Sequence, residues 1–251
     1  MTLPQINIIG LAGLPEIEAG DDLSSLILRA TAESGLEIKA SDIFVIAQKI
    51  VSKSEGRIVQ LDTVTPSPMA REWAEAYNKD ARMVEVVLNE SRRIVRMDRG
   101  VLICETRHGF VCANAGVDAS NIAEGRVVLL PQNPDRSAQK IREELERALN
   151  IRVAVIISDT FGRPWREGLV NVAIGVSGLA PLIDYRGQAD SFGRPLQVTV
   201  IAAADEIASA AEMVMKKSAG IPVAIVRGFD LGSEEGSGRD LIRRAEQDIF
   251  R

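Results

Sequence analysis

The sequence predicts an α+β protein in which mixed sheets are flanked by helices. Short apolar runs rich in β-branched residues and amphipathic helical stretches are interspersed along the chain, but they do not alternate strictly. The 251 residues, of which 46% are hydrophobic, are enough for one large domain or two intimately joined lobes. Because no internal repeat, low-complexity tract or flexible linker divides the sequence, we expect a single domain over residues 1–251.

The first half of the chain is expected to begin and end its elements at recognisable residues. Asp21 and Asp22 suit the N-terminus of an amphipathic helix that continues to about Ser34. Gly100 and Gly109 are natural turns between neighbouring strands. Strands are expected at Ile6–Ile9, Ile43–Ala47, Ile94–Met97, Val101–Glu105, Phe110–Ala113 and Val127–Leu130, and helices after Pro66-Ser67-Pro68 and at Met83–Glu90.

The second half shows the same mixture of elements. Pro134 starts a helix that reaches about Leu149, with Ile141 and Leu145 on its buried face. The apolar run that begins at Val153 predicts a strand ending at Asp159. Further strands are expected at Val170–Val176, Leu196–Ala202 and Ile221–Gly228, and further helices at Asp205–Lys216 and Asp240–Ile249.

Composition excludes several classes of function. The net charge of −5 argues against a nucleic-acid-binding surface, and no apolar run approaches the roughly 20 residues that span a bilayer. Residues Met1–Gln5 lack the basic start and long apolar stretch of a signal peptide, so a cytoplasmic location is expected. Cys104 and Cys112 suit core packing better than a redox role. The only histidine, His108, lies in an expected hairpin turn, so the chemistry must depend on carboxylates, lysines, arginines, hydroxyls or a metal.

Two polar segments each follow an apolar, β-like run. Asn114–Asn121 contains Asp118, and Asp159 precedes an expected glycine-containing loop, Phe161–Gly168, in which Arg163 and Arg166 would suit a phosphate or carboxylate. Two carboxylates released at strand ends could share a hard divalent cation, which prefers oxygen ligands and holds phosphates. An aspartate at either position also commonly caps a turn or a helix, and spacing alone leaves both interpretations open.

Two further segments are candidates. In Ser52–Gly56, Lys53 would either pair with a phosphate or be a solvated surface lysine, and the Walker A order of residues is absent. Gly187–Pro195 would either close over a ligand or form an ordinary connection. We assign no role to the loop Gly232–Gly238.

Five motifs then occur in a fixed order: Gly13-Leu14-Pro15, Ser52–Gly56, Asn114–Asn121, Ser158–Arg163 and Gly220-Ile221-Pro222. Together they resemble the coenzyme F-420-0:L-glutamate ligases, the gamma-glutamyl ligases of deazaflavin cofactor biosynthesis. The resemblance extends from about Ile9 to Gly228, and its Asn-Ala-Gly-x-Asp-x-Ser-Asn string is far more specific than a single glycine-rich loop.

The resemblance implies a GTP-dependent amide ligase that needs a divalent metal, Mg²⁺ or Mn²⁺, with two ions expected, and often K⁺. In such an enzyme GTP phosphorylates the terminal carboxylate of F-420-0, and the amine of L-glutamate attacks the acyl phosphate. Repetition on F-420-1 adds gamma-linked glutamates. The family's fold is an unusual α+β arrangement that forms an intertwined homodimer. Some bacterial relatives add a C-terminal nitroreductase-like flavin domain, which is not expected here because the sequence ends at Arg251.

The resemblance also assigns residues. It makes Asp118 and Asp159 the catalytic, metal-binding aspartates and Thr160 their companion metal ligand. It gives nucleotide contacts to Leu14, Pro15, Glu16, Ile17, Gln48, Lys49, Lys53 and Asn121. Gln48 and Lys49 replace residues that are often small and hydroxylated in archaeal members, so those contacts are expected to differ.

The chain departs from the family again before Gly220. Archaeal members carry a glycine- and acid-rich loop there that contacts the nucleotide and the second metal, whereas this chain has Lys216 and Lys217. We expect Lys216, Lys217 and Gly220 at the nucleotide, with a lysine meeting a phosphate, and the protein ligands of the second metal stay open. Two alternative functions also stay open: another metal-dependent phosphoryl-transfer or nucleotide-hydrolysing enzyme, and a non-catalytic GTP-binding module.

Overall fold

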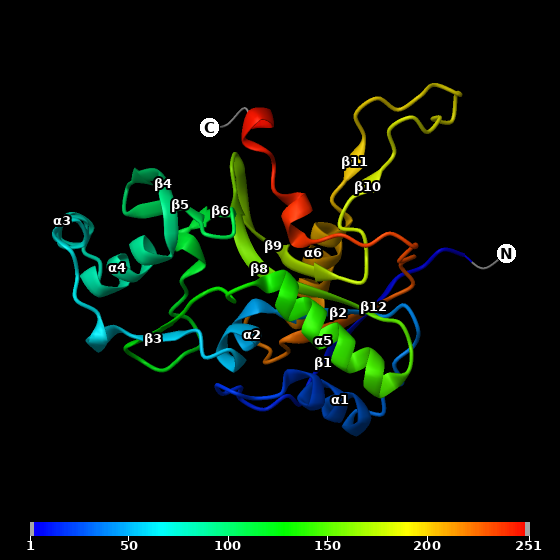
Figure 1. The fold of residues 1–251 in the computed structure, drawn as a ribbon, viewed down its shortest axis with the longest axis horizontal. Coiled ribbons are helices and arrows are strands. Elements are labelled where there is room, and N and C mark those ends of the chain that lie inside the picture. Colours follow the sequence, from blue (N-terminus) through cyan, green and yellow to red (C-terminus); the bar gives the residue numbers. More distant parts are fainter. Residues whose placement is uncertain (1–2, 249–251) are drawn as a thin grey trace.

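A five-stranded mixed sheet lies at the centre of the computed structural model, which describes residues 3–248 (Figure 1). Across the sheet, β2 and β8 are parallel and the other neighbouring pairs are antiparallel. In spatial order the strands are β1 (Asn7–Leu11), β12 (Val223–Arg227), β2 (Ile43–Ala47), β8 (Ala154–Arg163) and β9 (Arg166–Ser177). The expected mixed sheet with flanking helices is therefore confirmed.

Helices cover both faces of this sheet. Helices α1 (Leu23–Glu33) and α5 (Pro134–Leu149) pack on one face, and α6 (Ala203–Met215) packs on the other. Because successive strand residues point to opposite faces, Phe44 joins the first cluster and its neighbour Val45 joins the second. Burial on both faces explains why these strands appear in the sequence as continuous apolar runs.

A third hydrophobic cluster lies beside the central sheet (Figure 1). Its elements are α3 (Pro68–Tyr77), α4 (Ala81–Glu90), the sheet of β4 (Ser91–Asp98), β5 (Val101–Thr106) and β6 (Val111–Ala113), and the pair of β3 (Ile58–Gln60) and β7 (Arg126–Val128). Cys104 and Cys112 are directly opposite each other on β5 and β6, both buried and unoxidised. Burial, with smaller contributions from Asp159 and Cys104, raises the pKa of Cys112 to about 12, which agrees with a packing role.

Three expectations about the elements were wrong. The expected strand Leu196–Ala202 is reduced to β11 (Val200–Ile201), which pairs with β10 (Ile183–Asp184) at the base of a projecting arm (Figure 1). The expected helix Asp240–Ile249 is replaced by two single 3₁₀ turns, Gly238–Leu241 and Ala245–Gln247. Its side chains are mostly exposed, and its apolar residues Leu241 and Ile242 pack against different clusters instead of forming one face. Its last residue, Ile249, lies outside the described residues.

The third error concerns the segment after Asp159. A loop was expected over Phe161–Gly168, but β8 continues to Arg163 and β9 begins at Arg166, so the two strands form one long hairpin. The sequence analysis also assigned no element to α2 (Gln48–Ser54), whose start has no capping side chain that could signal it. None of the helices within residues 3–248 combines the length and hydrophobicity needed to cross a bilayer.

Candidate functional site

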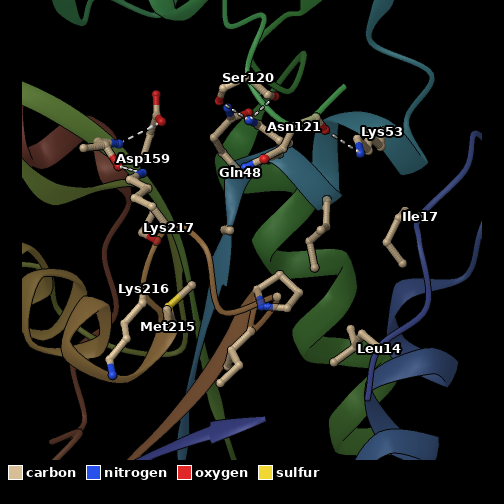
Figure 2. Close-up of a pocket in the computed structure, with 18 of the residues that line it drawn as sticks. Leu14, Ile17, Gln48, Lys53, Ser120, Asn121, Asp159, Met215, Lys216 and Lys217 are labelled. Atoms are coloured by element: carbon tan, nitrogen blue, oxygen red, sulfur yellow. Dashed lines mark hydrogen bonds between the residues drawn. The ribbon is translucent and has the colours of Figure 1, made fainter. Parts of the chain in front are cut away.

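A pocket of about 450 Å³ opens between the loop before α1, the start of α2 and the end of α6 (Figure 2). Leu14 and Ile17 lie on one side, and Lys216 and Lys217 lie on the other (Figure 2). Every residue assigned to the site from the sequence lines this pocket: Leu14, Pro15, Glu16, Ile17, Gln48, Lys49, Lys53, Asp118, Asn121, Asp159, Thr160, Lys216, Lys217 and Gly220. Segments that are far apart in the sequence therefore meet in one place.

Asp118 reaches the pocket from a tight turn. The three residues Asn114–Gly116 all have left-handed backbone conformations, with φ angles of 53°, 51° and 73°. Such angles are uncommon for non-glycine residues and concentrate at functional sites. A side chain at the third position would also collide with Leu130, since an added Cβ would lie 2.7 Å from it. Backbone hydrogen bonds between Asp118 and Val128 then fix the aspartate beside β7.

The carboxylate of Asp118 is held by two neighbours. Ser120 donates to it from its backbone nitrogen (2.7 Å) and from its hydroxyl (2.8 Å), and the Lys49 ammonium lies 2.7 Å away. Burial alone would raise the pKa of Asp118, but the hydrogen bonds from Lys49 and Ser120 outweigh it and lower the pKa below its ordinary value. Asp118 is therefore ionised near neutral pH.

Asp159 lies within β8, opposite Val172 of β9. Its carboxylate is half-buried in the pocket wall and accepts a hydrogen bond from the Thr160 backbone nitrogen at 2.7 Å. Burial raises the pKa of Asp159 to about 6, and the charge of Asp118 adds to this rise, whereas Thr160, Lys217 and Lys49 act against it. The site thus contains two carboxylates whose environments shift their pKa values in opposite directions.

Ser158 is a further lining residue that the sequence analysis did not assign to the site. Its side chain is only 2% exposed, and its hydroxyl has no hydrogen-bond partner within the described residues. A register shift between Ile157 and Ser158 interrupts the β8–β9 pairing at this point, so that both Ser158 and Asp159 line the pocket. A buried hydroxyl without a partner beside a pocket is suited to bonding a ligand. Its position directly before Asp159 is the signal that could have identified it.

The wall beside Asp159 is a chain of hydrogen bonds. Thr160 donates its hydroxyl to the Asn171 side-chain oxygen (2.7 Å), and the Asn171 amide donates to Glu212 (3.0 Å). Lys217 donates its ammonium to the Thr160 hydroxyl oxygen. Asn171 and Glu212 line the pocket but were missed from the sequence. Asn171 is the one amide in the apolar run Val170–Val176, which is a signal that could have identified it.

Lys53 is largely buried at the opposite side of the pocket, with 7% of its surface exposed. Its ammonium contacts the carboxylate of Glu16 and donates to the backbone oxygen of Asn121 at 3.2 Å (Figure 2). The alternative of a solvated surface lysine is therefore wrong. Two loops that meet at the pocket are joined by this one cation.

Comparison with known proteins identifies the family. A family model described as F420-0:Gamma-glutamyl ligase matches residues 12–228. The chain belongs to this ligase family. It is 47% identical to the "Coenzyme F420:L-glutamate ligase" of Methanothermobacter thermautotrophicus, over 98% of this chain and 99% of that protein. Proteins of the same name from Methanocaldococcus jannaschii and Archaeoglobus fulgidus are 48% and 40% identical, each over 98% of this chain and 97% of the relative.

Other segments suggested by the sequence lie outside this pocket. Gly187–Pro195 forms part of the β10–β11 arm, which projects away from the central sheet, and none of its residues lines the pocket (Figure 1). Arg163 and Arg166 lie at the turn of the β8–β9 hairpin and also do not line it. His108 occupies a half-buried turn, where its ring lies 3.2 Å from the Gln132 carbonyl. The structure gives these residues no part in this pocket.

The two aspartates suit a single hard cation. The raised pKa of Asp159 reflects negative charge that burial and Asp118 leave uncompensated, and a cation between the two carboxylates would compensate it. Within residues 3–248, no group of three or more histidine, cysteine, aspartate or glutamate residues is close enough to hold a metal ion. Asp118 and Asp159 are therefore the carboxylates that this pocket would offer to a cation.

Proposed function

We propose that this chain is a GTP- and divalent-metal-dependent ligase that joins L-glutamate to coenzyme F-420-0 and then adds gamma-linked glutamates. Family membership supports the ligation of glutamate to this coenzyme. The observation that carries the finer proposal is the pair Asp118 and Asp159, which line one pocket and differ in the direction of their pKa shifts. Ionisable groups perturbed in this way are typical of active sites.

The first step would be phosphoryl transfer. A carboxylate oxygen of F-420-0 forms a bond to the γ-phosphorus of GTP as the bond to the departing GDP breaks. A divalent cation, when bound, would neutralise part of the phosphate charge. Asp118 and Asp159 would hold that cation, and Ser120 and Lys49 keep Asp118 ionised and fixed for this purpose. Catalysis then depends mainly on positioning and electrostatics.

The second step would form the amide. The glutamate amine attacks the acyl carbon, the amine gives up a proton to solvent, and phosphate leaves with the electrons of the carbon–oxygen bond. Ser158 would donate its hydroxyl to a phosphate oxygen, since that donor has no partner in the described part of the protein. The volume of about 450 Å³ falls in the range of small-molecule sites. The wall formed by Leu14–Ile17, Gln48 and Asn121 would receive the nucleotide.

A mass assay tests the ligase proposal. The purified protein is incubated with F-420-0, GTP, Mg²⁺ or Mn²⁺ and L-glutamate, and the coenzyme is expected to gain mass in steps of one glutamyl residue. Omission of glutamate should stop the gain, and so should the substitution Asp159→Asn. No mass gain with either metal would refute ligation. GTP hydrolysis without glutamate would then favour the phosphatase alternative, and GTP binding without turnover would favour a binding module.

We also propose a homodimer, as the family resemblance implies. Exposed apolar side chains on the β8–β9 hairpin and the β10–β11 arm support it, because Trp165, Leu169 and Phe192 are 80%, 67% and 84% exposed. Light scattering coupled to size-exclusion chromatography is expected to give twice the chain mass of 27.2 kDa. A monomer at micromolar concentration would refute this assembly without affecting the ligase proposal.

A further inference from the structure

The charges that line the pocket are balanced. Its wall contains four carboxylates and four ammonium groups, which are Glu16, Asp118, Asp159, Glu212, Lys49, Lys53, Lys216 and Lys217. A site that holds two divalent ions through protein ligands needs a surplus of carboxylates to offset their charge. Here lysines already accompany the acids, so the protein itself supplies much of the positive charge that phosphate transfer requires.

Lys217 contacts Thr160, the residue that the family resemblance makes a metal ligand. Helix α6 ends at Met215, and the left-handed conformation of Lys216 (φ 50°) redirects the chain so that the next residue faces β8. Lys217 lies beside Asp159, whereas Lys216 points away from it (Figure 2). The ammonium of Lys217 donates to the Thr160 hydroxyl, directly beside Asp159 in the sequence.

The surroundings of Thr160 disfavour a divalent ion there. Its hydroxyl proton is directed to Asn171, and its oxygen accepts from Lys217, so the oxygen is already engaged on both sides. Glu212 is the nearest further acid along this wall, and it is occupied by the Asn171 amide.

We propose that the ammonium of Lys217 takes the place of the second divalent cation, so that the enzyme works with one divalent ion, held by Asp118 and Asp159. This inference rests on the proposed ligase function. It replaces the expectation of two ions and of Thr160 as a metal ligand, which came from the family resemblance alone. In this arrangement Thr160 positions Lys217, and Lys217 meets the transferred phosphate as a point charge.

Counting bound Mn²⁺ tests the inference without measuring activity. Electron paramagnetic resonance of free Mn²⁺ is followed during titration of the protein saturated with a non-hydrolysable GTP analogue. The wild-type protein is expected to bind one ion per bound nucleotide. The variant Lys217→Glu is expected to bind two, because it removes the ammonium and adds a carboxylate beside Thr160 and Asp159. Lys216→Glu is the matched control and should still bind one, since that side chain points away from Asp159.

Each possible number of bound Mn²⁺ ions either supports or refutes the inference. Two ions in the wild-type protein would refute the inference, while the mass assay for ligation would stand independently. One ion in both the wild-type protein and Lys217→Glu would show that Lys217 does not hold the second position, which also refutes it. No bound ion in the wild-type protein would refute the proposed metal site and this inference together. Lys217 is exposed, so the variant should fold, and Lys217→Gln, with a weaker second binding event, provides an independent check.

Discussion

Replacing Asp159 by asparagine should make the metal-free protein more stable while it abolishes ligation. The half-buried carboxylate of Asp159 has a pKa of about 6, above its ordinary value of 3.8, so the ionised form is disfavoured in the folded protein. Asparagine has the same shape and carries no charge. Its amide oxygen can still accept the hydrogen bond that Thr160 donates from its backbone nitrogen at 2.7 Å. The substitution therefore removes the charge and keeps the local geometry.

The magnitude follows from the pKa difference. About two pKa units correspond to about 3 kcal/mol of unfolding free energy at pH 8, at 1.36 kcal/mol per unit. This is an upper value, because Asp159 is only half-buried and solvent screens part of the effect. Between about pH 4 and pH 6 the folded protein binds more protons than the unfolded chain. The contribution of Asp159 to stability is therefore present below pH 4 and is lost as the pH rises through 6. Lowering the pH from 8 to 5 raises the contribution of Asp159 to the unfolding free energy by about 1.4 kcal/mol.

Urea unfolding of both proteins with EDTA, at pH 8 and at pH 5, measures the effect. Subtracting the pH dependence of Asp159→Asn from that of the wild-type protein cancels the contributions of the titrating groups that do not interact with Asp159. The difference should be about 1.4 kcal/mol, with the wild-type protein gaining at the lower pH. The reasoning would be wrong if both proteins showed the same pH dependence, or if the variant were less stable at pH 8.

Three further substitutions have defined outcomes. Ser158→Ala removes a hydroxyl without a partner in the described structure, so urea unfolding should change by less than 1 kcal/mol while the ligation rate falls about tenfold; an unchanged rate would remove Ser158 from the site. Lys49→Gln should raise the pKa of Asp118, because burial then acts with less opposition; carboxyl titration by NMR measures this, and an unchanged pKa would contradict it. Asp42→Ala should cost about 3–5 kcal/mol in urea unfolding, since it leaves Arg227, at 2.6 and 2.7 Å, without its fully buried partner; a loss below 1 kcal/mol would show that the pair contributes little.

The central sheet was predictable because its strands are continuous apolar runs with few competing interpretations. Ile43–Ala47 was expected with the bounds that the structure has, and the helix from Pro134 to Leu149 was expected from its proline start and apolar face. The strand predicted over Leu196–Ala202 was wrong because this segment is apolar but largely lacks a pairing strand. Its Val198 is 84% exposed. Tertiary pairing, which no local pattern contains, decides such cases.

The site was predictable in position but only through whole motifs. Spacing alone could not bring Asp118 and Asp159 together, since one lies on an irregular turn and the other within a strand. Motif resemblance named residues that all line one pocket. It could not name Asn171 or Glu212, because these take part through side-chain hydrogen bonds that cross from β8 to β9 and α6. Such contacts depend on packing, and their one trace in the sequence is the amide of Asn171 within an apolar run.

The two aspartates are fixed in different ways, and this difference assigns separate tasks to their neighbours. Asp159 lies on β8, which pairs with β2 on one side and with β9 on the other near Ile157. Its position therefore depends on the whole sheet. Asp118 follows a strained turn and depends on Ser120 and Lys49 for its orientation. Local contacts therefore hold Asp118, whereas the sheet holds Asp159. Each carboxylate has a lysine on its own side of the pocket, with Lys49 beside Asp118 and Lys217 beside Asp159.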